Sequence, residues 1–185
     1  MKKLSPNMKM PWIVAHRGAS EKYPENSMIS FRQAVRESAD GIELDVQWSR
    51  DFTPVVFHDR TLKIIGQKKQ EISHLTYADI QKHISDPGIP DLGCVLKALG
   101  SKTHWLIELK SYSLLTKKQK EKALRNIKTL MNRYNLNQKA FILSFDRELL
   151  ELGASLFPRT RFVLNMNRPY PANKRTESIL KKFYA

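Results

Sequence analysis

The sequence predicts an α/β fold, a TIM-type (β/α) barrel, on two observations. Short apolar runs suited to buried strands alternate with longer stretches in which apolar residues recur at helical spacing. Such alternation is typical of parallel strands joined by right-handed helical crossovers. Charged and imidazole side chains close at least four of the runs, and the functional groups of such barrels lie at the carboxyl ends of the strands. An open doubly wound sheet is the alternative, although Arg17-Gly18-Ala19-Ser20 matches its glycine-rich nucleotide turn poorly.

The strands follow from the apolar runs, taken in order along the chain. The first runs are Trp12–Ala15 and Gly41–Ile42, and the next are Pro54–Phe57 and Trp105–Ile107. With their polar ends, and with two later runs, they predict strands at residues 11–16, 41–47, 54–58, 104–110, 139–144 and 160–164. A closed barrel needs eight strands and typically about 250 residues. We therefore expect an incomplete barrel, with about six of the eight strands.

The helices follow from apolar residues at a period near 3.6 and from capping residues. They are expected at residues 27–39, 77–84, 91–99, 115–134, 146–156 and 176–184. Asn26 or Ser27 is the expected N-cap of the first helix, Asp91 caps the third and Asp146 the fifth.

Length and composition indicate one domain over residues 1–185, without a membrane span or a secretory signal, and hence a cytoplasmic protein. The formal net charge of +14 favours anionic partners, although scattered solvated lysines are the simpler explanation. No zinc-finger spacing or aromatic and basic interleaving is present, so nucleic acid is not an expected partner. The lone Cys94 fits a reducing compartment, and its apolar neighbours predict a small buried side chain.

Acidic side chains at the strand ends predict a metal site. Glu43 and Asp45 lie two residues apart in one strand and so share a face, as do Glu108 and Lys110 in another. Two carboxylates on one buried face are costly unless a cation lies between them. Three oxygen donors from Glu43, Asp45 and Glu108 suit Mg²⁺ or Ca²⁺. The alternative is that each acid pairs with a nearby Arg or Lys, the commoner fate of a single buried acid.

Two histidines and two basic residues complete the candidate site. His16 and His58 follow apolar strands, and their pKa values near neutrality suit a general acid and a general base. The planar donor group of Arg17 matches a phosphate, and Lys110 either holds a phosphate oxygen or neutralises the acids. Together with a cation, these groups indicate cleavage of a phosphate ester.

In this order and spacing, the clusters resemble the glycerophosphodiester phosphodiesterase family. The resemblance extends over nearly the whole chain, through the segments His16–Ser20, Pro24–Ser27, Gly41–Val46, Pro54–Leu62, Ile89–Leu96, Ile107–Lys110 and Ser144–Asp146. Several such clusters together are far more specific than any one of them.

This resemblance implies a TIM barrel that hydrolyses glycerophosphodiesters to glycerol 3-phosphate and an alcohol with a divalent metal. By the same resemblance, Glu43, Asp45 and Glu108 bind the metal, and His16 and His58 act as acid and base. Arg17 and Lys110 would contact the phosphate.

The sequence departs from the family pattern in two ways that bear on the fold. Where the family usually has Asp-Gly, this chain has Asp51-Phe52, and a phenylalanine disfavours a left-handed turn, so we expect this loop to differ in shape. The family's last strand-helix units have no counterpart after Arg168. We therefore expect a shortened barrel, which a homo-oligomer or a companion chain could complete.

Two alternatives to the main function remain open at this point. One is phospholipase D-type activity on lysophospholipids, which related barrels perform with similar residues. The other is a catalytically silent truncated barrel, which the short C-terminus would favour.

Overall fold

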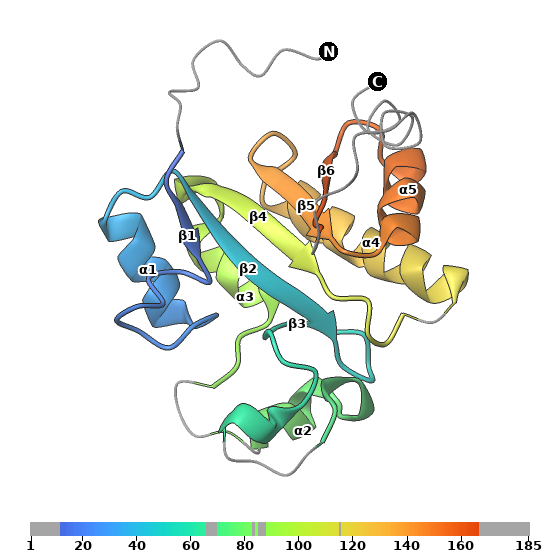
Figure 1. Cartoon of the computed structure of the whole chain (residues 1–185), viewed down its shortest axis with the longest axis horizontal. Helices are drawn as coiled ribbons and strands as arrows, with labels where there is room; N and C mark the ends of the chain where they lie inside the picture. Colours follow the sequence, from blue (N-terminus) through green and yellow to red (C-terminus); the bar gives the residue numbers. More distant parts are fainter. Residues whose placement is uncertain (1–11, 66–69, 83, 85–87, 115, 167–185) are drawn as a thin grey trace.

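A twisted six-stranded sheet flanked by helices forms the body of the protein (Figure 1). The computed structural model describes residues 12–65, 70–82, 84, 88–114 and 116–166. Five strands lie side by side in parallel, and their order is β1 (Val14–His16), β2 (Gly41–Trp48), β4 (His104–Leu109), β5 (Ala140–Ser144) and β6 (Arg161–Leu164). The predicted α/β class and its six strands are thereby confirmed.

Strand β3 (Pro54–Val56) departs from the parallel pairing that the alternation of strands and helices predicts. It pairs antiparallel with β2, with Trp48 opposite Pro54 and Val46 opposite Val56. Only residues 49–53 join the two strands, whereas a parallel crossover needs a dozen residues or more. The connection therefore has to be a hairpin.

Five α-helices begin and end close to their predicted positions, and they are α1 (Met28–Arg36), α2 (Tyr77–Lys82), α3 (Leu92–Leu99), α4 (Lys117–Arg133) and α5 (Arg147–Leu156). Ser27, Asp91 and Asp146 each accept a hydrogen bond from a backbone N–H three residues on, so the predicted N-caps are confirmed. Short 3-10 turns lie at Leu62–Ile65, Ile72–His74 and Gly100–Lys102. The helix predicted at 176–184 lies outside the described residues. No helix within the described ranges is long and apolar enough to cross a membrane.

Strand β2 is buried along its whole length, with different chemistry on its two faces. Ile42, Leu44 and the next alternate side chains belong to the main hydrophobic core, which includes Phe31 and Trp105. The opposite face carries the polar side chains that alternate with them, among them Glu43. These buried polar groups need partners inside the protein, and this need shapes the site.

A second, smaller core lies below the hairpin of β2 and β3 and is built around α2 (Figure 1). Its buried residues are Val55, Leu62, Ile72, Ile80 and Ile89. Val55 and Leu62 bracket the loop that carries His58, so this loop is anchored at both ends by buried apolar side chains.

Cys94 is exposed on α3, which corrects the expected burial of its side chain. The core face of α3 is made by Leu92 and by residues 95, 96 and 99, and position 94 points away from that face. A hydrogen bond with Asp91, together with partial burial, raises the pKa of the Cys94 thiol to about 11. The thiol is therefore protonated at neutral pH and is a poor nucleophile.

Phe52 keeps the left-handed backbone that glycine usually supplies in this turn, contrary to the expectation of a differently shaped loop. Its φ is 61°, which costs a residue with a Cβ roughly 1–2 kcal/mol. Contacts with α4 offset this cost: the Lys122 ammonium lies 3.9 Å from the ring centroid, and Asn126 Nδ2 donates to the Phe52 carbonyl at 3.1 Å. The turn is thus tied to a helix distant in sequence.

The packing of α5 on β6 leaves no room for a side chain at Gly153, where an added Cβ would lie 2.5 Å from the Phe162 ring. We expect Gly153→Ala to lower the free energy of unfolding by about 1–3 kcal/mol, although alanine favours a helix by about 1 kcal/mol over glycine. Urea denaturation measures the change. Ser155→Ala, at an exposed position of the same helix, is the control. The loss should shrink in a Phe162→Leu background, and a Gly153→Ala variant more stable than wild type would contradict this packing.

Candidate active site

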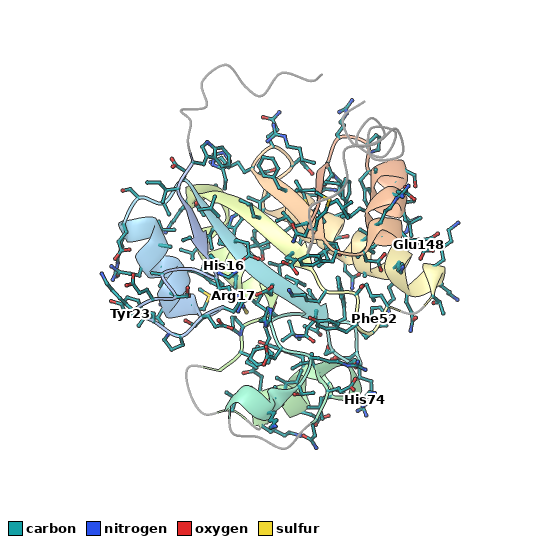
Figure 2. The ribbon with its side chains drawn as sticks, in the orientation of Figure 1. His16, Arg17, Tyr23, Phe52, His74 and Glu148 are labelled. Carbon is teal, nitrogen blue, oxygen red and sulfur yellow. The ribbon has the colours of Figure 1, made fainter. Side chains whose placement is uncertain are left out.

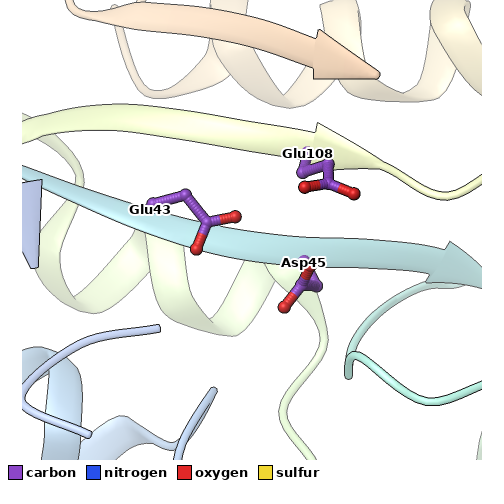
Figure 3. A group of neighbouring side chains, drawn as sticks. All are labelled: Glu43, Asp45 and Glu108. Atoms are coloured by element: carbon purple, nitrogen blue, oxygen red, sulfur yellow. The ribbon is translucent and has the colours of Figure 1, made fainter. Parts of the chain in front are cut away.

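Three carboxylates come together on the polar face of β2 and β4. Glu43 and Asp45 extend from β2 and Glu108 from β4, on the same side of the sheet (Figure 3). Asp45 and Glu108 are direct neighbours in the parallel register, so their side chains leave the sheet side by side. Oxygen atoms of all three lie within 4.8 Å of one another, and each residue is at most 8% exposed.

Basic side chains neutralise two of these acids. Lys110 Nζ contacts both Glu108 Oε1 and Asp45 Oδ1, the latter at 2.9 Å. Arg17 Nε lies 3.1 Å from Asp45 Oδ2, and its Nη1 lies 2.9 Å from Glu25. Burial alone would lower the pKa of Lys110, but the two carboxylates hold it above its ordinary value. The pairing of acids with basic residues, the alternative to a metal, therefore occurs at Asp45 and Glu108.

Glu43 is the acid with the weakest compensation. Its Oε2 accepts a hydrogen bond from the Arg17 backbone N–H at 3.2 Å and lies 3.8 Å from His16 Nε2. Burial and the negative charges of Asp45 and Glu108 raise the pKa of Glu43 to about 8. The cluster thus lacks positive charge, and a divalent cation would supply it. Three carboxylates at this spacing fit such an ion.

Asp45 is held by side chains that approach both of its oxygens. Asn26 Nδ2 donates to Asp45 Oδ2 at 2.8 Å, and Asn26 Oδ1 accepts from the Asp45 backbone N–H at 3.2 Å. Arg17 approaches the same Oδ2, so Oδ1 is the oxygen that faces Lys110.

Glu108 and Glu43 each also have one carboxylate oxygen that accepts a hydrogen bond from a fixed donor. Asn165 Nδ2 donates to Glu108 Oε2 at 3.1 Å, while Oε1 faces Lys110. Glu43 receives the Arg17 backbone N–H on Oε2. In each acid, therefore, a fixed donor occupies one oxygen and orients the other.

The end of β1 carries His16, and a tight turn directly after it carries Arg17; both are labelled in Figure 2, and they contact Glu43 and Asp45 respectively. Arg17 has a φ of 56° and Gly18 a φ of 83°, so two consecutive residues adopt left-handed backbone. An added Cβ at Gly18 would lie 2.8 Å from the backbone carbon of Ser30, which explains why only glycine fits there. The His16 side chain is 68% exposed, so it borders solvent as well as Glu43.

His58 lies on the loop after β3. Its Nδ1 is 2.7 Å from Asp59 Oδ1. The Phe57 backbone N–H donates to the Asp45 carbonyl at 3.1 Å, and Gln47 Nε2 donates to the carbonyls of Phe57 and Asp59, both at 2.8 Å. Gln47 shares the polar face of β2 with Glu43 and Asp45, so this face also positions the His58 loop.

The structure thus joins most of the predicted site residues by direct contacts, namely His16, Arg17, Glu43, Asp45, Glu108 and Lys110. His58 differs, because the carboxyl group that contacts its ring belongs to Asp59 rather than to one of the three acids.

Three residues that support the site were not predicted from the sequence, although each has a sequence feature that points to the site. Gln47 continues the alternation of Glu43 and Asp45 on one strand face. Asn26 is a residue type tolerant of left-handed backbone, and its φ is 54°. Asn165 directly follows a strand, as Lys110 does, and a polar residue at that place merits inspection.

The raised pKa of Glu43 predicts how stability varies with pH in the metal-free protein. Between the ordinary value of 4.5 and about 8, the unfolded chain has lost this proton and the folded chain retains it. The free energy of unfolding should therefore fall as pH rises through this window, by about 1.4 kcal/mol for each pH unit. Denaturant titrations in a chelator, at intervals from pH 5 to pH 8.5, measure the slope.

Glu43→Gln removes the titrating group and should flatten this part of the profile. Glu37→Gln, which changes an exposed acid at the end of α1, is the matched control. A wild-type stability that rises steadily from pH 5 to pH 8 would show that Glu43 is ionised throughout.

Comparison with known proteins identifies what this arrangement is similar to. The model of the glycerophosphoryl diester phosphodiesterase family matches residues 16–184. Protein YqiK of Bacillus subtilis is 33% identical over 181 residues, covering 92% of this chain and 73% of that protein. A glycerophosphodiester phosphodiesterase of Caldanaerobacter subterraneus subsp. tengcongensis is 32% identical over 162 residues, covering 82% of this chain and 65% of that protein.

A solved structure agrees with these sequence matches. The crystal structure of glycerophosphodiester phosphodiesterase from Thermotoga maritima superposes with a TM-score of 0.75 at 25% identity, covering 95% of this chain and 72% of that one. The likeness confirms the predicted barrel-type α/β fold. It also shows that this chain spans about three quarters of that relative.

Proposed function

Because this chain belongs to the glycerophosphoryl diester phosphodiesterase family, we propose that it hydrolyses glycerophosphodiesters to glycerol 3-phosphate and an alcohol. The observation that carries the proposal is the convergence of three buried carboxylates within 4.8 Å of one another on one face of the adjacent parallel strands β2 and β4. Basic and imidazole groups surround them. This is the set of groups that cleavage of a phosphodiester requires.

Glu43, Asp45 and Glu108 are the proposed ligands of a divalent cation, Mg²⁺ or Ca²⁺. Their hard oxygen donors and their excess negative charge support this assignment, since burial and like charges already raise the pKa of Glu43 to about 8. A cation bound there would offset the negative charge that develops on the phosphate oxygens.

His16 and His58 are the proposed acid and base. One withdraws a proton from the water whose oxygen bonds to phosphorus, and the other gives a proton to the oxygen of the leaving alcohol as its bond to phosphorus breaks. The contact of His58 Nδ1 with Asp59 Oδ1 at 2.7 Å favours a ring whose Nδ1 carries the proton, which leaves Nε2 to accept one. The large exposure of His16 gives it access to substrate and solvent.

Arg17 and Lys110 are the proposed phosphate-binding residues. Arg17 is already fixed by Glu25 and Asp45, so its guanidinium keeps one orientation. Lys110 bridges Asp45 and Glu108 here. In the cation-loaded protein, we propose that its ammonium exchanges these carboxylates for a phosphate oxygen.

One surface feature favours a second candidate, phospholipase D-type activity on lysophospholipids. Tyr112, Phe145 and Met166 follow β4, β5 and β6 respectively, and they are 44%, 48% and 50% exposed. Large apolar side chains after three neighbouring strands lie on the edge of the sheet that carries the site. They would suit a substrate with an acyl chain.

We further propose a single domain over residues 1–185 and a cytoplasmic location, supported by the lone cysteine, which cannot form an internal disulfide. Completion of the barrel by a second copy or a companion chain stays a prediction. Measuring the mass of the purified protein in solution tests the first of these.

The decisive test is hydrolysis of glycerophosphocholine and glycerophosphoethanolamine with Mg²⁺ or Ca²⁺. We expect turnover that a chelator abolishes and that His16→Ala and His58→Ala each lower by about 100-fold or more, since proton transfer by a positioned side chain contributes about that much. His74→Ala is the control, because His74 is 75% exposed and far from His16 in Figure 2.

The same assay separates the alternatives. Faster release of choline from lysophosphatidylcholine than from glycerophosphocholine would favour the phospholipase D-type activity. A folded protein that binds the cation but turns over neither substrate would contradict both and favour a catalytically silent barrel.

A further inference from the structure

Asn165 directly follows β6 and reaches across the sheet to the acidic cluster. Its backbone N–H donates to the Ser144 carbonyl at the end of β5, at 2.9 Å. Its side-chain Nδ2 donates to Glu108 Oε2, on β4, at 3.1 Å. One half-buried residue therefore links the carboxyl ends of three adjacent strands.

Glu108 depends on this contact more than Asp45 depends on any single partner. Asp45 is held by Arg17 and by two hydrogen bonds with Asn26. Within the described part of the chain, the Glu108 carboxylate contacts the side chain of Lys110 through Oε1 and that of Asn165 through Oε2. Under the proposed function Lys110 moves to the phosphate, and Asn165 is then the donor that remains.

An amide suits this task for a chemical reason. Its N–H is a neutral donor, so it orients a carboxylate without competing with a cation for the negative charge. A glutamate has one more rotatable bond than an aspartate, and fixing it before the cation arrives lowers the entropy lost on binding. Groups that hold metal ligands in this way change metal affinity by roughly 10- to 100-fold.

We propose that Asn165 is a positioning residue for cation binding, which holds Glu108 Oε2 so that Oε1 faces the cation. The proposal rests on the proposed function, because it takes Glu108 as a ligand. It assigns β6 a role in the site, although none of the three acids lies on that strand.

The test measures cation affinity directly, with the full chain and without substrate. Calorimetric titration with Ca²⁺ and with Mg²⁺ is applied to wild type, Asn165→Ala and Asn132→Ala. Asn132 is an exposed asparagine near the end of α4 and is the matched control. We expect Asn165→Ala to weaken binding by about 10-fold or more, and Asn132→Ala to bind as wild type does.

A second comparison separates positioning from a general effect on the fold. If Asn165 acts through Glu108, Asn165→Ala should add no further loss of affinity in a Glu108→Ala background. The melting temperature of each metal-free variant is measured alongside. If the alanine variant loses its fold, Asn165→Leu, which keeps the branched shape of the side chain without its polar atoms, replaces it.

Three results would overturn the inference. Asn165→Ala could bind the cation as tightly as Asn132→Ala does, while Glu108→Ala binds weakly, and then the cation site stands but Asn165 has no part in it. Asn165→Ala could weaken binding equally in the Glu108→Ala background, which would mean that it acts by another route. Full affinity in Glu108→Ala would remove both this inference and the proposed cation site.

Discussion

Mutual repulsion of three buried carboxylates is the constraint that the surrounding structure meets. Glu43, Asp45 and Glu108 share one face of two adjacent parallel strands, away from most solvent. Leaving even one such charge unpaired in a protein interior costs several kcal/mol. The Lys110 bridge and the Arg17 contact reduce this repulsion without removing it, and burial together with the remaining repulsion raises the pKa of Glu43. The cation-free site has too little positive charge for its three acids, and this favours the binding of a cation together with a phosphate.

The backbone around the acids carries strain that serves the same end. Arg17 and Asn26 are both non-glycine residues with positive φ, and both contact Asp45. Left-handed backbone at such residues costs free energy and persists where the surroundings require it. Here the turn after β1 places the Arg17 backbone N–H as a donor to Glu43 and the Arg17 guanidinium as an ion-pair partner of Asp45, so the strained backbone helps to orient both carboxylates.

The sequence predicted those features of the fold that depend on local periodicity and capping. The period of two along residues 43–45 predicted a shared face, and Ser27, Asp91 and Asp146 predicted helix starts, because both depend on near neighbours. The apolar run of β3 looks alike in either pairing direction, and the antiparallel pairing follows instead from the short connection of residues 49–53. The contact of Asn165 with Glu108 joins residues 57 positions apart and depends on the sheet order, which no local pattern contains.

Local sequence patterns also failed to predict which side chain of α3 is exposed and which backbone conformation Phe52 adopts. Cys94 lies among apolar residues at helical spacing, but a helix on the surface buries only one stripe of side chains. Position 94 falls outside the buried stripe of α3, next to positions that belong to it. Phe52 shows the converse, because a conformation that its type disfavours is held by Lys122 and Asn126, far along the chain. At Phe52, therefore, tertiary contacts outweigh the local preference.

Gln47 has a consequence for how the site responds to heat. Its single amide nitrogen donates to the carbonyls on either side of His58, and its own strand is buried at every position. These two hydrogen bonds couple the loop that carries His58 to the central strand, so we expect the loop to open together with that strand. Amide hydrogens of this loop should exchange with deuterium at rates set by cooperative opening of the sheet, even though the loop lies at the rim of the molecule.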